Sequence, residues 1–317
     1  MRAAVVPAPE DTPRYGEFPD PHAGPDDVLL ELVAAALHPL VRSRARGTHY
    51  SSSDEYPLVP GVDGVGRTHD GELVYAGEVT QPWGTFAERF ASPRDRTVPL
   101  PDGADPVAVA AGMNPGMSSW MPLTGHLAAG GSLGTVLVLG ATGTAGGLAV
   151  QNARRLGAGR VVGVGRDPAE LERVLALGAE PVALTGDAGT DAHALTATLD
   201  GEAPDLVLDY LWGAPAEVAF RALDAGPAGD GTVYVEIGAV AGPTAALPAA
   251  LLRSRRFRVR GSGIGSVDMS RYRDEAVTFL GRIAAGLVVV PTTTYPLERV
   301  AEAWQSTNGR RAVVTPV

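Results

Sequence analysis

The sequence predicts an α/β protein in which a doubly wound parallel sheet is joined to an irregular, mostly β domain. Three observations predict this fold. From Asp105 onward, buried strand-like segments alternate with helix-like segments. One of these strands runs through a glycine-rich turn directly into a helix. The first hundred residues, by contrast, are rich in proline and glycine and show weak helical periodicity.

The N-terminal hundred residues contain short β-prone segments separated by long loops. The longest loop runs from Thr48 to Pro60. The pattern changes at Asp105-Pro106, where the aspartate suits the N-cap of a helix and the proline suits its first position. We therefore expect a β-rich domain that ends near this helix. Its β-prone segments are Asp27–Val33, Leu73–Tyr75 and Ala87–Phe90.

Six apolar segments in the middle of the chain predict the strands of the parallel sheet. They are Thr135–Leu139, Arg160–Val164, Pro181–Leu184, Asp205–Asp209, Thr232–Ile237 and Phe257–Arg260. Helix-like stretches separate them, at 145–156, 168–177, 191–199, 214–224 and 247–254. Strands that alternate with helices in this way form a parallel sheet with helices on both faces.

The C-terminal tail is too short to fold alone, so we expect it to rejoin the N-terminal domain. It reads as a helix, a strand, an amphipathic helix and a final strand, at Tyr272–Ala285, Leu287–Val290, Leu297–Trp304 and Arg311–Thr315. The expected domains are therefore 1–111 together with 263–317, which would carry the substrate, and 112–262, which would carry a dinucleotide.

The glycine turn after the first of the six strands is the strongest functional signal. Gly140, Gly143 and Gly146 lie between that strand and an apolar-periodic helix. Such a turn points free backbone N–H groups and the positive end of a helix at one spot, which suits a pyrophosphate. The spacing G-x-x-G-x-x-G departs from the usual fingerprint, so the strand–turn–helix context carries the prediction. A tight turn that binds nothing is the alternative.

The end of the second strand predicts which dinucleotide would bind. An acidic residue usually stands there and binds the ribose 2′-hydroxyl, but this chain has Gly165-Arg166. A guanidinium can make paired bonds to a 2′-phosphate, so NADPH is preferred over NADH. Asp167 is better explained as the N-cap of the next helix. The alternative for Arg166 is a solvated surface arginine.

The composition excludes several classes of protein. Net charge is −10 over 317 residues, which argues against a nucleic-acid surface. No apolar run reaches the length of a membrane span, and the N-terminus lacks the apolar core of a signal peptide, so we expect a cytoplasmic protein without membrane contact. The chain has no cysteine and no lysine, which rules out disulfides, thiolate nucleophiles, a P-loop lysine and Schiff-base chemistry. The basic residues that cluster are Arg253, Arg255, Arg256 and Arg258.

Five short motifs, in order along nearly the whole chain, resemble those of one family. Residues 58–66 read LVPGVDGVG, 84–88 read GTFAE, 100–103 read LPDG, 235–238 read VEIG and 309–314 read GRRAVV. In this order and spacing they resemble the zinc-independent medium-chain dehydrogenases/reductases of the quinone oxidoreductase type. The resemblance implies a Rossmann domain for the parallel sheet and a GroES-like domain for the β-rich part.

The resemblance also implies where a nicotinamide cofactor would lie, in the cleft between the two domains. Thr144 and Ala145 would sit at the pyrophosphate, beside Gly140, Gly143 and Gly146 of the turn, while Gly165 and Arg166 are expected at the ribose phosphate from the strand end described above. Asp209, Tyr210 and Leu211 would flank the ribose and the ring. Backbone atoms of Ile237, Gly238, Ala239, Gly263 and Ile264 would hold the ring, and Arg311 would approach from the tail.

No metal site is expected. Zinc alcohol dehydrogenases of the same superfamily have Gly-His-Glu where this chain has Gly61-Val62-Asp63, and their cysteine ligands are missing here. None of the six histidines shows paired ligand spacing.

The residues for proton transfer are harder to assign. Many relatives carry Asn-Pro-x-Asp-x-Tyr where this chain has His-Pro-Leu-Val-Arg-Ser, beginning at His38. His38 is the first candidate for orienting or protonating the substrate, and a histidine bonded to the backbone at a domain edge is the alternative. Tyr50 and Tyr56 are the next candidates for lining the pocket, unless they are ordinary loop aromatics.

Three functions remain open at this point. The first is an NADPH-dependent reductase of a small molecule, namely a quinone, enone or similar electron-poor carbonyl compound, because hydride chemistry belongs to the cofactor. The second is a dedicated reductase in a secondary-metabolite pathway, which the unusual segment at His38 would fit. The third is a redox-inactive protein that binds NADPH. The family resemblance further implies a homodimer.

Overall fold

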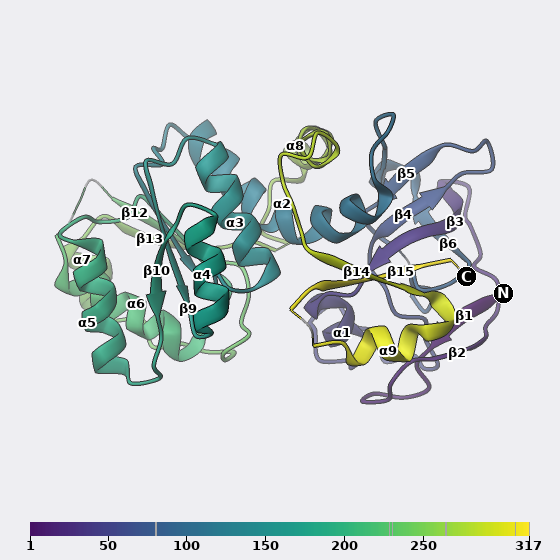
Figure 1. Cartoon of the computed structure of the whole chain (residues 1–317), viewed down its shortest axis with the longest axis horizontal. Helices are drawn as coiled ribbons and strands as arrows, with labels where there is room; N and C mark the ends of the chain where they lie inside the picture. The colour runs from purple at the N-terminus through teal and green to yellow at the C-terminus, as the bar shows by residue number, and fades with distance from the viewer. Residues whose placement is uncertain (80, 228, 230, 264, 308, 317) are drawn as a thin grey trace. The chain divides into compact units, whose positions relative to one another are not determined.

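The computed structural model of the chain describes residues 1–79, 81–227, 229, 231–263, 265–307 and 309–316 (Figure 1). It divides into two compact units. The β-rich unit comprises Met1–Pro115 and Arg273–Val317, and the parallel-sheet unit comprises Gly116–Tyr272. No described helix combines the length and the apolar character that a membrane span requires.

The parallel-sheet unit is built on six parallel strands, which confirms the predicted doubly wound sheet. Their order is β10-β9-β8-β11-β12-β13, so the winding reverses between β8 and β11. Ligands of such sheets bind outside the carboxyl ends of the strands at this reversal. The strands are β8 (Thr135–Leu139), β9 (Arg160–Gly165), β10 (Glu180–Ala183), β11 (Leu206–Asp209), β12 (Thr232–Glu236) and β13 (Phe257–Gly261).

Helices cover both faces of this sheet because its central strands are apolar on both sides. Every residue of β8 and of β11 is buried. One face packs against α2 (Pro106–Ala128), α3 (Thr144–Arg155) and α4 (Pro168–Ala176). The other face packs against α5 (Ala188–Leu199), α6 (Gly213–Ala225) and α7 (Ala249–Ser254), where Phe220, Tyr234 and Phe257 form an aromatic cluster.

The β-rich unit holds a seven-stranded sheet and a separate two-stranded one. The large sheet follows the order β14-β15-β3-β4-β5-β7, and β6 also pairs with β3. Its strands are β3 (Asp27–Ala36), β4 (Gly64–Arg67), β5 (Leu73–Ala76), β6 (Arg89–Pro93), β7 (Thr97–Pro99), β14 (Thr292–Pro296) and β15 (Arg311–Thr315). The small sheet pairs β1 (Arg2–Val5) with β2 (Arg14–Glu17). Short helices complete the unit, namely α1 (Pro39–Ala45), η1 (Arg94–Arg96), η2 (Leu297–Arg299) and α9 (Val300–Gln305).

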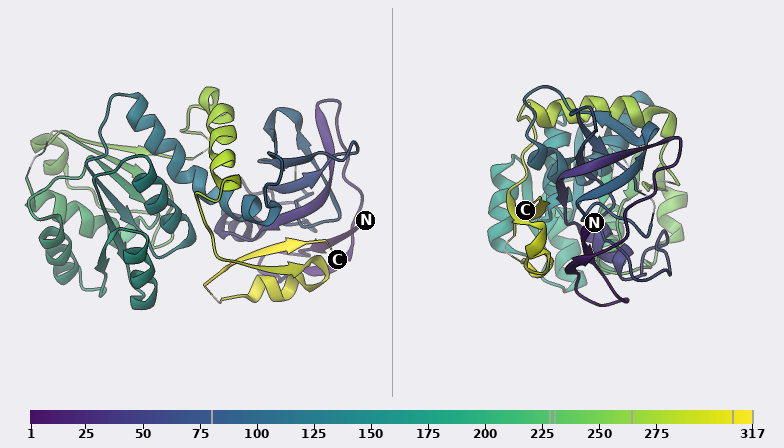
Figure 2. Two further views of the ribbon diagram at one scale, coloured as in Figure 1. Left: turned by 45° about the horizontal axis from the view of Figure 1, so that its top comes forward. Right: turned by 90° about the vertical axis from the view of Figure 1, so that its right-hand side faces the viewer.

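The C-terminal tail completes the sheet of the β-rich unit. β15 pairs antiparallel with β3, with Val313 opposite Ala36, and β14 pairs parallel with β15. Figure 2 shows these strands, in yellow, beside the purple N-terminal strands. The N-terminal sheet is therefore finished by the last residues of the chain.

One predicted strand of the tail is wrong. The residues Leu287–Val290 form no strand; they connect α8 (Met269–Ala284) to β14. Gly286, with φ of +66°, turns the chain after α8, and Val288 is then buried while Val289 is 62% exposed. The strand that pairs with Arg311–Thr315 is instead Thr292–Pro296, which lies in register with it.

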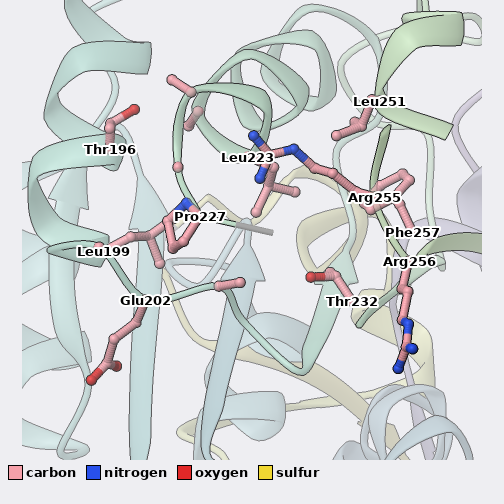
Figure 3. A pocket seen from close by; sticks show the side chains of 15 residues that line it. Thr196, Leu199, Glu202, Leu223, Pro227, Thr232, Leu251, Arg255, Arg256 and Phe257 are labelled. Carbon is pink, nitrogen blue, oxygen red and sulfur yellow. The ribbon is translucent and has the colours of Figure 1, made fainter. Parts of the chain in front are cut away.

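A cavity of about 200 Å³ lies at the amino edge of the parallel sheet (Figure 3). Its lining residues come from the ends of α5, α6 and α7 and from the first residues of β12 and β13. Since all six strands are parallel, this edge is the one opposite the turn that follows β8.

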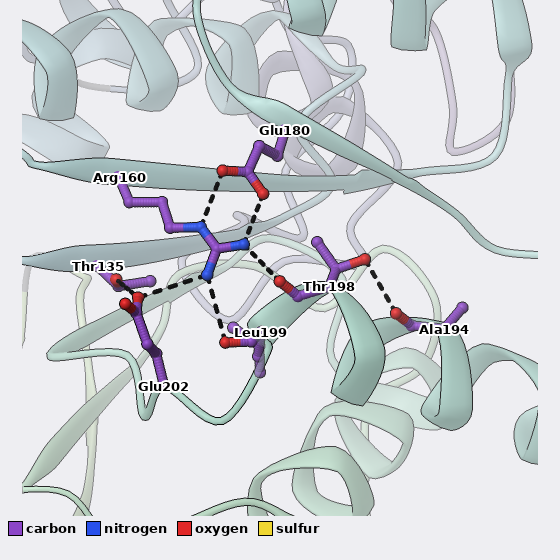
Figure 4. A network of polar contacts seen from close by, with 7 residues as sticks. All are labelled: Thr135, Arg160, Glu180, Ala194, Thr198, Leu199 and Glu202. Atoms are coloured by element: carbon purple, nitrogen blue, oxygen red, sulfur yellow. Dashed lines mark hydrogen bonds and ion pairs between the residues drawn. The ribbon is translucent and has the colours of Figure 1, made fainter.

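Next to this cavity, the Arg160 guanidinium joins two strands to the end of a helix (Figure 4). Nε and Nη2 donate to the two oxygens of Glu180 on β10 at 2.8 and 2.6 Å. Nη1 donates to the carbonyl oxygen of Leu199 at 3.3 Å, and Nη2 donates to that of Thr198. Glu202 accepts from Arg160 Nη1 at 3.4 Å and from Thr135 at 3.0 Å. A cation here also suits the negative end of α5.

We expect Arg160→Met to lower the free energy of unfolding by about 1–3 kcal/mol, because it removes a two-bond carboxylate pair and the donors to the α5 carbonyls. Arg155→Met is the control, since the Arg155 side chain is exposed and forms no hydrogen bond with the described residues. Urea titration of the wild type and both variants measures the effect.

The difference in free energy of unfolding between the wild type and Arg160→Met should depend on pH. Arg160 lowers the pKa of Glu180 from its ordinary 4.5, so this contribution is present above that value and is lost as the pH falls through the folded-state pKa. Half of the Glu180 side chain is exposed, and solvent screening keeps the effect modest. If the difference in free energy of unfolding between the wild type and Arg160→Met stays the same in acid, the Arg160–Glu180 ion pair is not its cause.

Candidate functional site

The turn from β8 to α3 is possible only without side chains at two of its glycines. Gly140 has φ of +88°, a conformation that favours glycine. At Gly146, a Cβ atom would lie 2.1 Å from the carbonyl oxygen of Gly140, which is backbone and cannot move aside. These contacts bring the start of α3 directly against the end of β8.

The start of α3 presents unpaired backbone donors. Gly143 is its N-cap and offers no side-chain acceptor. The N–H groups of Thr144, Ala145 and Gly146 form no hydrogen bond with any described residue, as is usual for the first turn of a helix. A Cβ atom at Gly143 would have its nearest neighbour at 3.5 Å, so the approach to these donors is open. Together with the helix dipole they can bind an anion such as a pyrophosphate.

The end of β9 lies beside this turn and carries an unpaired cation. A Cβ atom at Gly165 would lie 2.3 Å from Cγ2 of Thr142, so glycine is required where the two turns touch. Arg166 is exposed and forms no hydrogen bond or ion pair with any described residue. Asp167 caps α4, as predicted, by accepting from the N–H groups of Ala169 and Glu170 at 2.9 and 3.2 Å. Its carboxylate is therefore occupied, whereas the guanidinium of Arg166 is available.

Asp209, at the end of β11, is fully buried and uses its carboxylate inside the protein. One oxygen accepts from the N–H groups of Leu211 and Trp212 at 2.7 and 3.0 Å. The other accepts from the Tyr234 hydroxyl at 2.6 Å. Burial raises the pKa of Asp209, and these three hydrogen bonds oppose that shift. The carboxylate fixes the loop after β11 and leaves no free oxygen for a ribose.

That loop is held in a strained conformation next to the glycine turn. Trp212 has φ of 53° and ψ of −158°, a region that costs about 1–3 kcal/mol outside glycine. Leu211 lies against Gly140, where a Cβ atom would be 3.1 Å from its Cδ2. Tyr210 forms a 3.1 Å hydrogen bond with Ser118 of α2, and burial raises the pKa of Tyr210 to about 12. Tyr210 and Leu211 thus adjoin the turn, and their expected place beside a ribose and a nicotinamide ring stays a prediction.

Glu236, at the end of β12, was missed in the sequence analysis. It is the register neighbour of Asp209 and is half-buried, with no hydrogen bond from its carboxylate to the described residues. Burial and the nearby charge of Asp209 raise the pKa of Glu236. The signal was present in the sequence, because LVLD and TVYVE are parallel strands that both end in an acid.

The backbone segments expected around a nicotinamide ring follow β12 and β13. The N–H groups of Ile237 and Gly238 donate to the Asp209 carbonyl oxygen at 2.7 and 3.2 Å, and Ala239 comes next in the chain. Gly263 donates to the Ser266 hydroxyl at 2.8 Å. Ile264 lies outside the described residues. The described segments therefore sit at the carboxyl edge of the sheet, the same edge as the glycine turn.

In the β-rich unit, His38 belongs to a buried polar cluster with Asp63 and Tyr75. The three side chains are at most 3% exposed. Nε2 of His38 lies 2.8 Å from one oxygen of Asp63, and the Tyr75 hydroxyl donates to the other oxygen at 2.9 Å. His38 Nδ1 forms no hydrogen bond with the described residues. The partner of His38 is thus a carboxylate, not the backbone.

Arg311 is a buried cation whose charge interacts with Asp63 of this cluster. Its Nη1 donates to the carbonyl oxygen of Leu37 at 2.7 Å, and its Nε is enclosed without an acceptor among the described residues. Burial lowers the pKa of Arg311 to about 10, and the charge of Asp63 opposes that shift. Within its unit, Arg311 therefore holds the tail to the backbone beside His38.

The two loop tyrosines differ in their surroundings. Tyr50 is 81% exposed and stacks on His49 with 4.0 Å between ring centroids. Tyr56 donates to the Ala45 carbonyl oxygen at 2.7 Å and packs against the core of the β-rich unit. Burial raises the pKa of Tyr56. Tyr56 thus ties its loop to the end of α1, and its hydroxyl proton is already donated.

The donor atoms of the chain do not fit a zinc ion. A catalytic zinc takes three protein ligands, and a structural zinc takes four, most often cysteine or histidine. The sequence contains no cysteine, and within the described ranges no three His, Asp or Glu side chains come together. The described side chains therefore offer no ligand set for zinc.

Comparisons with known proteins place this chain among the dehydrogenases. A family described as "Zinc-binding dehydrogenase" matches residues 145–282. The probable NADPH-dependent quinone reductase tdiC of Emericella nidulans is 32% identical over 364 residues that cover all of both chains. The quinone oxidoreductase of Thermus thermophilus, solved also with NADPH, is 27% identical, with a TM-score of 0.79 over 99% of this chain and 100% of that one.

A mycobacterial quinone oxidoreductase shares the fold at lower identity. Its TM-score is 0.83 at 18% identity, over the full length of both chains. The full-length match to tdiC shows to which family the chain belongs. The missing zinc ligands, among the described residues, place it with the zinc-independent members of that family. The chain belongs to the medium-chain dehydrogenase/reductase family, as a zinc-independent member of the quinone oxidoreductase type.

Proposed function

We propose that the chain is an NADPH-dependent oxidoreductase that transfers hydride to a quinone, enone or similar electron-poor carbonyl compound without a metal. The observation that carries the proposal is the pairing of three free N–H groups at the start of α3 with the unpaired Arg166 at the end of the next strand. These donors match a pyrophosphate and a 2′-phosphate respectively. The names of tdiC and of the Thermus thermophilus complex support the same cofactor.

The parallel-sheet unit would act as the dinucleotide-binding domain and the β-rich unit as the substrate domain. Residues 143–146 would hold the pyrophosphate, and Gly165 would leave room for Arg166 to bind the 2′-phosphate. Asp209 would position the loop that carries Tyr210 and Leu211 instead of touching the ribose, since its carboxylate is occupied. The backbone of residues 237–239 and of Gly263 would face the ring.

When bound, the reduced nicotinamide supplies a hydride, so that reducing a conjugated double bond or a carbonyl also requires one proton. We propose His38 as the residue that orients the substrate or delivers this proton. Asp63 accepts from Nε2 and so fixes the ring orientation, and the proton delivered would be the one that the imidazolium carries on Nδ1. Tyr75 holds the other oxygen of Asp63 and keeps the carboxylate in place. Solvent is the alternative proton source.

The segment at His38 also supports a narrower function, a dedicated reductase in a secondary-metabolite pathway. His38, Val41 and Ser43 stand where many relatives have asparagine, aspartate and tyrosine. Val41 is 1% exposed, so this change replaces a polar position with a buried apolar one. A narrow choice among the substrates tested would favour this reading over a general quinone reductase.

We propose further that two copies form a homodimer through β13. This strand ends the sheet and pairs with β12, and all of its residues except Phe257 are exposed. An exposed edge strand is a template for pairing with another chain, and most soluble oligomers are symmetric dimers.

We expect the protein to oxidise NADPH in the presence of quinones or enones, and Arg166→Gln to raise the KM for NADPH about tenfold by removing charge-assisted hydrogen bonds. The KM for NADH should change little. Initial rates of cofactor oxidation, followed by absorbance with both cofactors, measure this, and Arg155→Gln is the matched surface control. Equal changes for NADH and NADPH would refute the 2′-phosphate assignment. Binding of NADPH without turnover on any substrate would instead support a redox-inactive binding protein.

We expect His38→Gln to lower kcat by about 100-fold, the low end of what a positioned acid contributes, without changing the Kd for NADPH. Asp63→Asn should lower kcat in the same direction, because the ring of His38 loses its anionic partner. Stopped-flow rates and fluorescence titration separate the two constants. His193→Gln, on the exposed face of α5, is the control. If kcat is unchanged in His38→Gln, the His38–Asp63 pair contributes to packing and not to catalysis.

We expect Val259→Glu to weaken the dimer at least about tenfold, because the substitution places like charges opposite each other across a two-fold axis. Val259 is 37% exposed in β13, so the folded subunit should tolerate the change. Light scattering after size exclusion, across a dilution series, measures the dissociation constant. Val277→Glu, on α8, is the control. A wild-type protein that is monomeric at every concentration would exclude this interface.

A further inference from the structure

The cavity at the amino edge of the parallel sheet is separate from the proposed cofactor site. It is lined by Thr232 and Phe257, which begin β12 and β13, whereas the glycine turn and Glu236 lie at the carboxyl ends of parallel strands. The five residues of β12 lie between the two edges, or roughly 15 Å of strand. A ligand in this cavity would therefore be a second one.

The walls of the cavity are mainly apolar (Figure 3). They are formed by Leu199 at the end of α5, Leu223 of α6, Leu251 of α7 and Phe257 of β13. The volume of about 200 Å³ exceeds the roughly 150 Å³ that admits a benzene ring in an apolar core. The cavity can thus hold a compact apolar group of about six or seven carbon atoms.

Arg255, the C-cap of α7, brings a guanidinium with two unsatisfied N–H donors to this apolar space, and its charge is paired at longer range with Asp224. Figure 3 shows its side chain extending toward Leu223. Nη2 donates to the backbone carbonyl oxygen of Asp224, but Nε and Nη1 are enclosed and lack acceptors within the described part of the chain. The carboxylate of Asp224 is 3.8 Å from Nε, too far for a hydrogen bond. Enclosed donors without acceptors are costly, so an acceptor from a ligand would be favourable.

The charges around the cavity favour an anion. Arg255 and Arg256 both line it and belong to the basic cluster of an otherwise acidic chain. Figure 3 shows the Arg256 guanidinium pointing away from that of Arg255, so Arg255 supplies the cation. The acidic residue in the lining, Glu202, does not oppose this, because its carboxylate accepts from Arg160 and Thr135 (Figure 4). Figure 3 shows the Glu202 carboxylate pointing away from the Arg255 guanidinium.

We propose that this cavity binds a small monocarboxylate with a compact apolar body, of the size of benzoate. The carboxylate would accept from the free N–H groups of Arg255, and the apolar body would pack against Leu223, Leu251 and Phe257. Charge-assisted hydrogen bonds in a partly enclosed site supply the affinity for the anion, and the apolar walls select against inorganic anions. This ligand site is independent of the proposed reductase activity.

Calorimetric titration of the full chain with benzoate, benzamide and inorganic phosphate tests the proposal. Benzoate should bind at least about tenfold more tightly than either benzamide, which lacks the charge, or phosphate, which lacks the ring. Arg255→Gln should weaken benzoate binding to a similar extent. Arg253→Gln should change it less than about twofold, because Arg253 belongs to the same cluster but is exposed on α7. Cooperative thermal unfolding checks that each variant folds.

Three results would overturn the proposal. Equal binding of benzoate and benzamide would remove the role of the cation. Benzoate binding that survives Arg255→Gln would place the anion elsewhere. Displacement of benzoate by NADPH, in proportion to NADPH occupancy, would show that the anion occupies the dinucleotide site. Leu251→Trp, which fills the cavity from a fully buried position, should abolish binding in a protein that still unfolds cooperatively.

Discussion

The close approach of α3 to the ends of β8 and β9 is the constraint on which the parallel-sheet unit depends. Gly146 and Gly165 allow it, because a Cβ atom at either would lie within 2.3 Å of the neighbouring turn. Gly163 plays the same part further down β9, where a Cβ atom would lie 2.6 Å from Val174 of α4. The approach leaves the first N–H groups of α3 at the edge of the sheet, next to the end of β9, and Arg166 is the residue that follows β9. The loop fixed by Asp209 then packs onto the same turn through Leu211.

Much of this unit could be predicted because its signals are local. β8 has the predicted bounds, and α3 is shifted by one residue, since a buried apolar run followed by glycines marks both elements within a short window. Asp167 was identified as a helix cap for the same reason. The strand expected at Leu287–Val290 failed because pairing depends on β15, some twenty residues later, and not on the apolar run itself.

The polar clusters could be predicted only in part, because their members are far apart in the sequence. His38 was a candidate from its position in a family segment, but its partner Asp63 is 25 residues away and was known only as part of a glycine motif. Glu236 ends its strand in an acid, as Asp209 does, but only the sheet register shows that the two residues are neighbours. The cofactor residues and the role of Arg166 remain predictions, since no contact within the chain can test them.

The way the tail closes the N-terminal sheet has a consequence for synthesis on the ribosome. β3 cannot gain its neighbour β15 until more than 270 further residues have been made, and the hydrogen bond from Arg311 to Leu37 spans 274 positions. The parallel-sheet unit, by contrast, is continuous in sequence from Gly116 to Tyr272 and completes its own core earlier. The nascent β-rich unit must therefore wait with an open sheet edge while the inserted unit folds, and during that interval it is the part most exposed to misassociation and to chaperone capture.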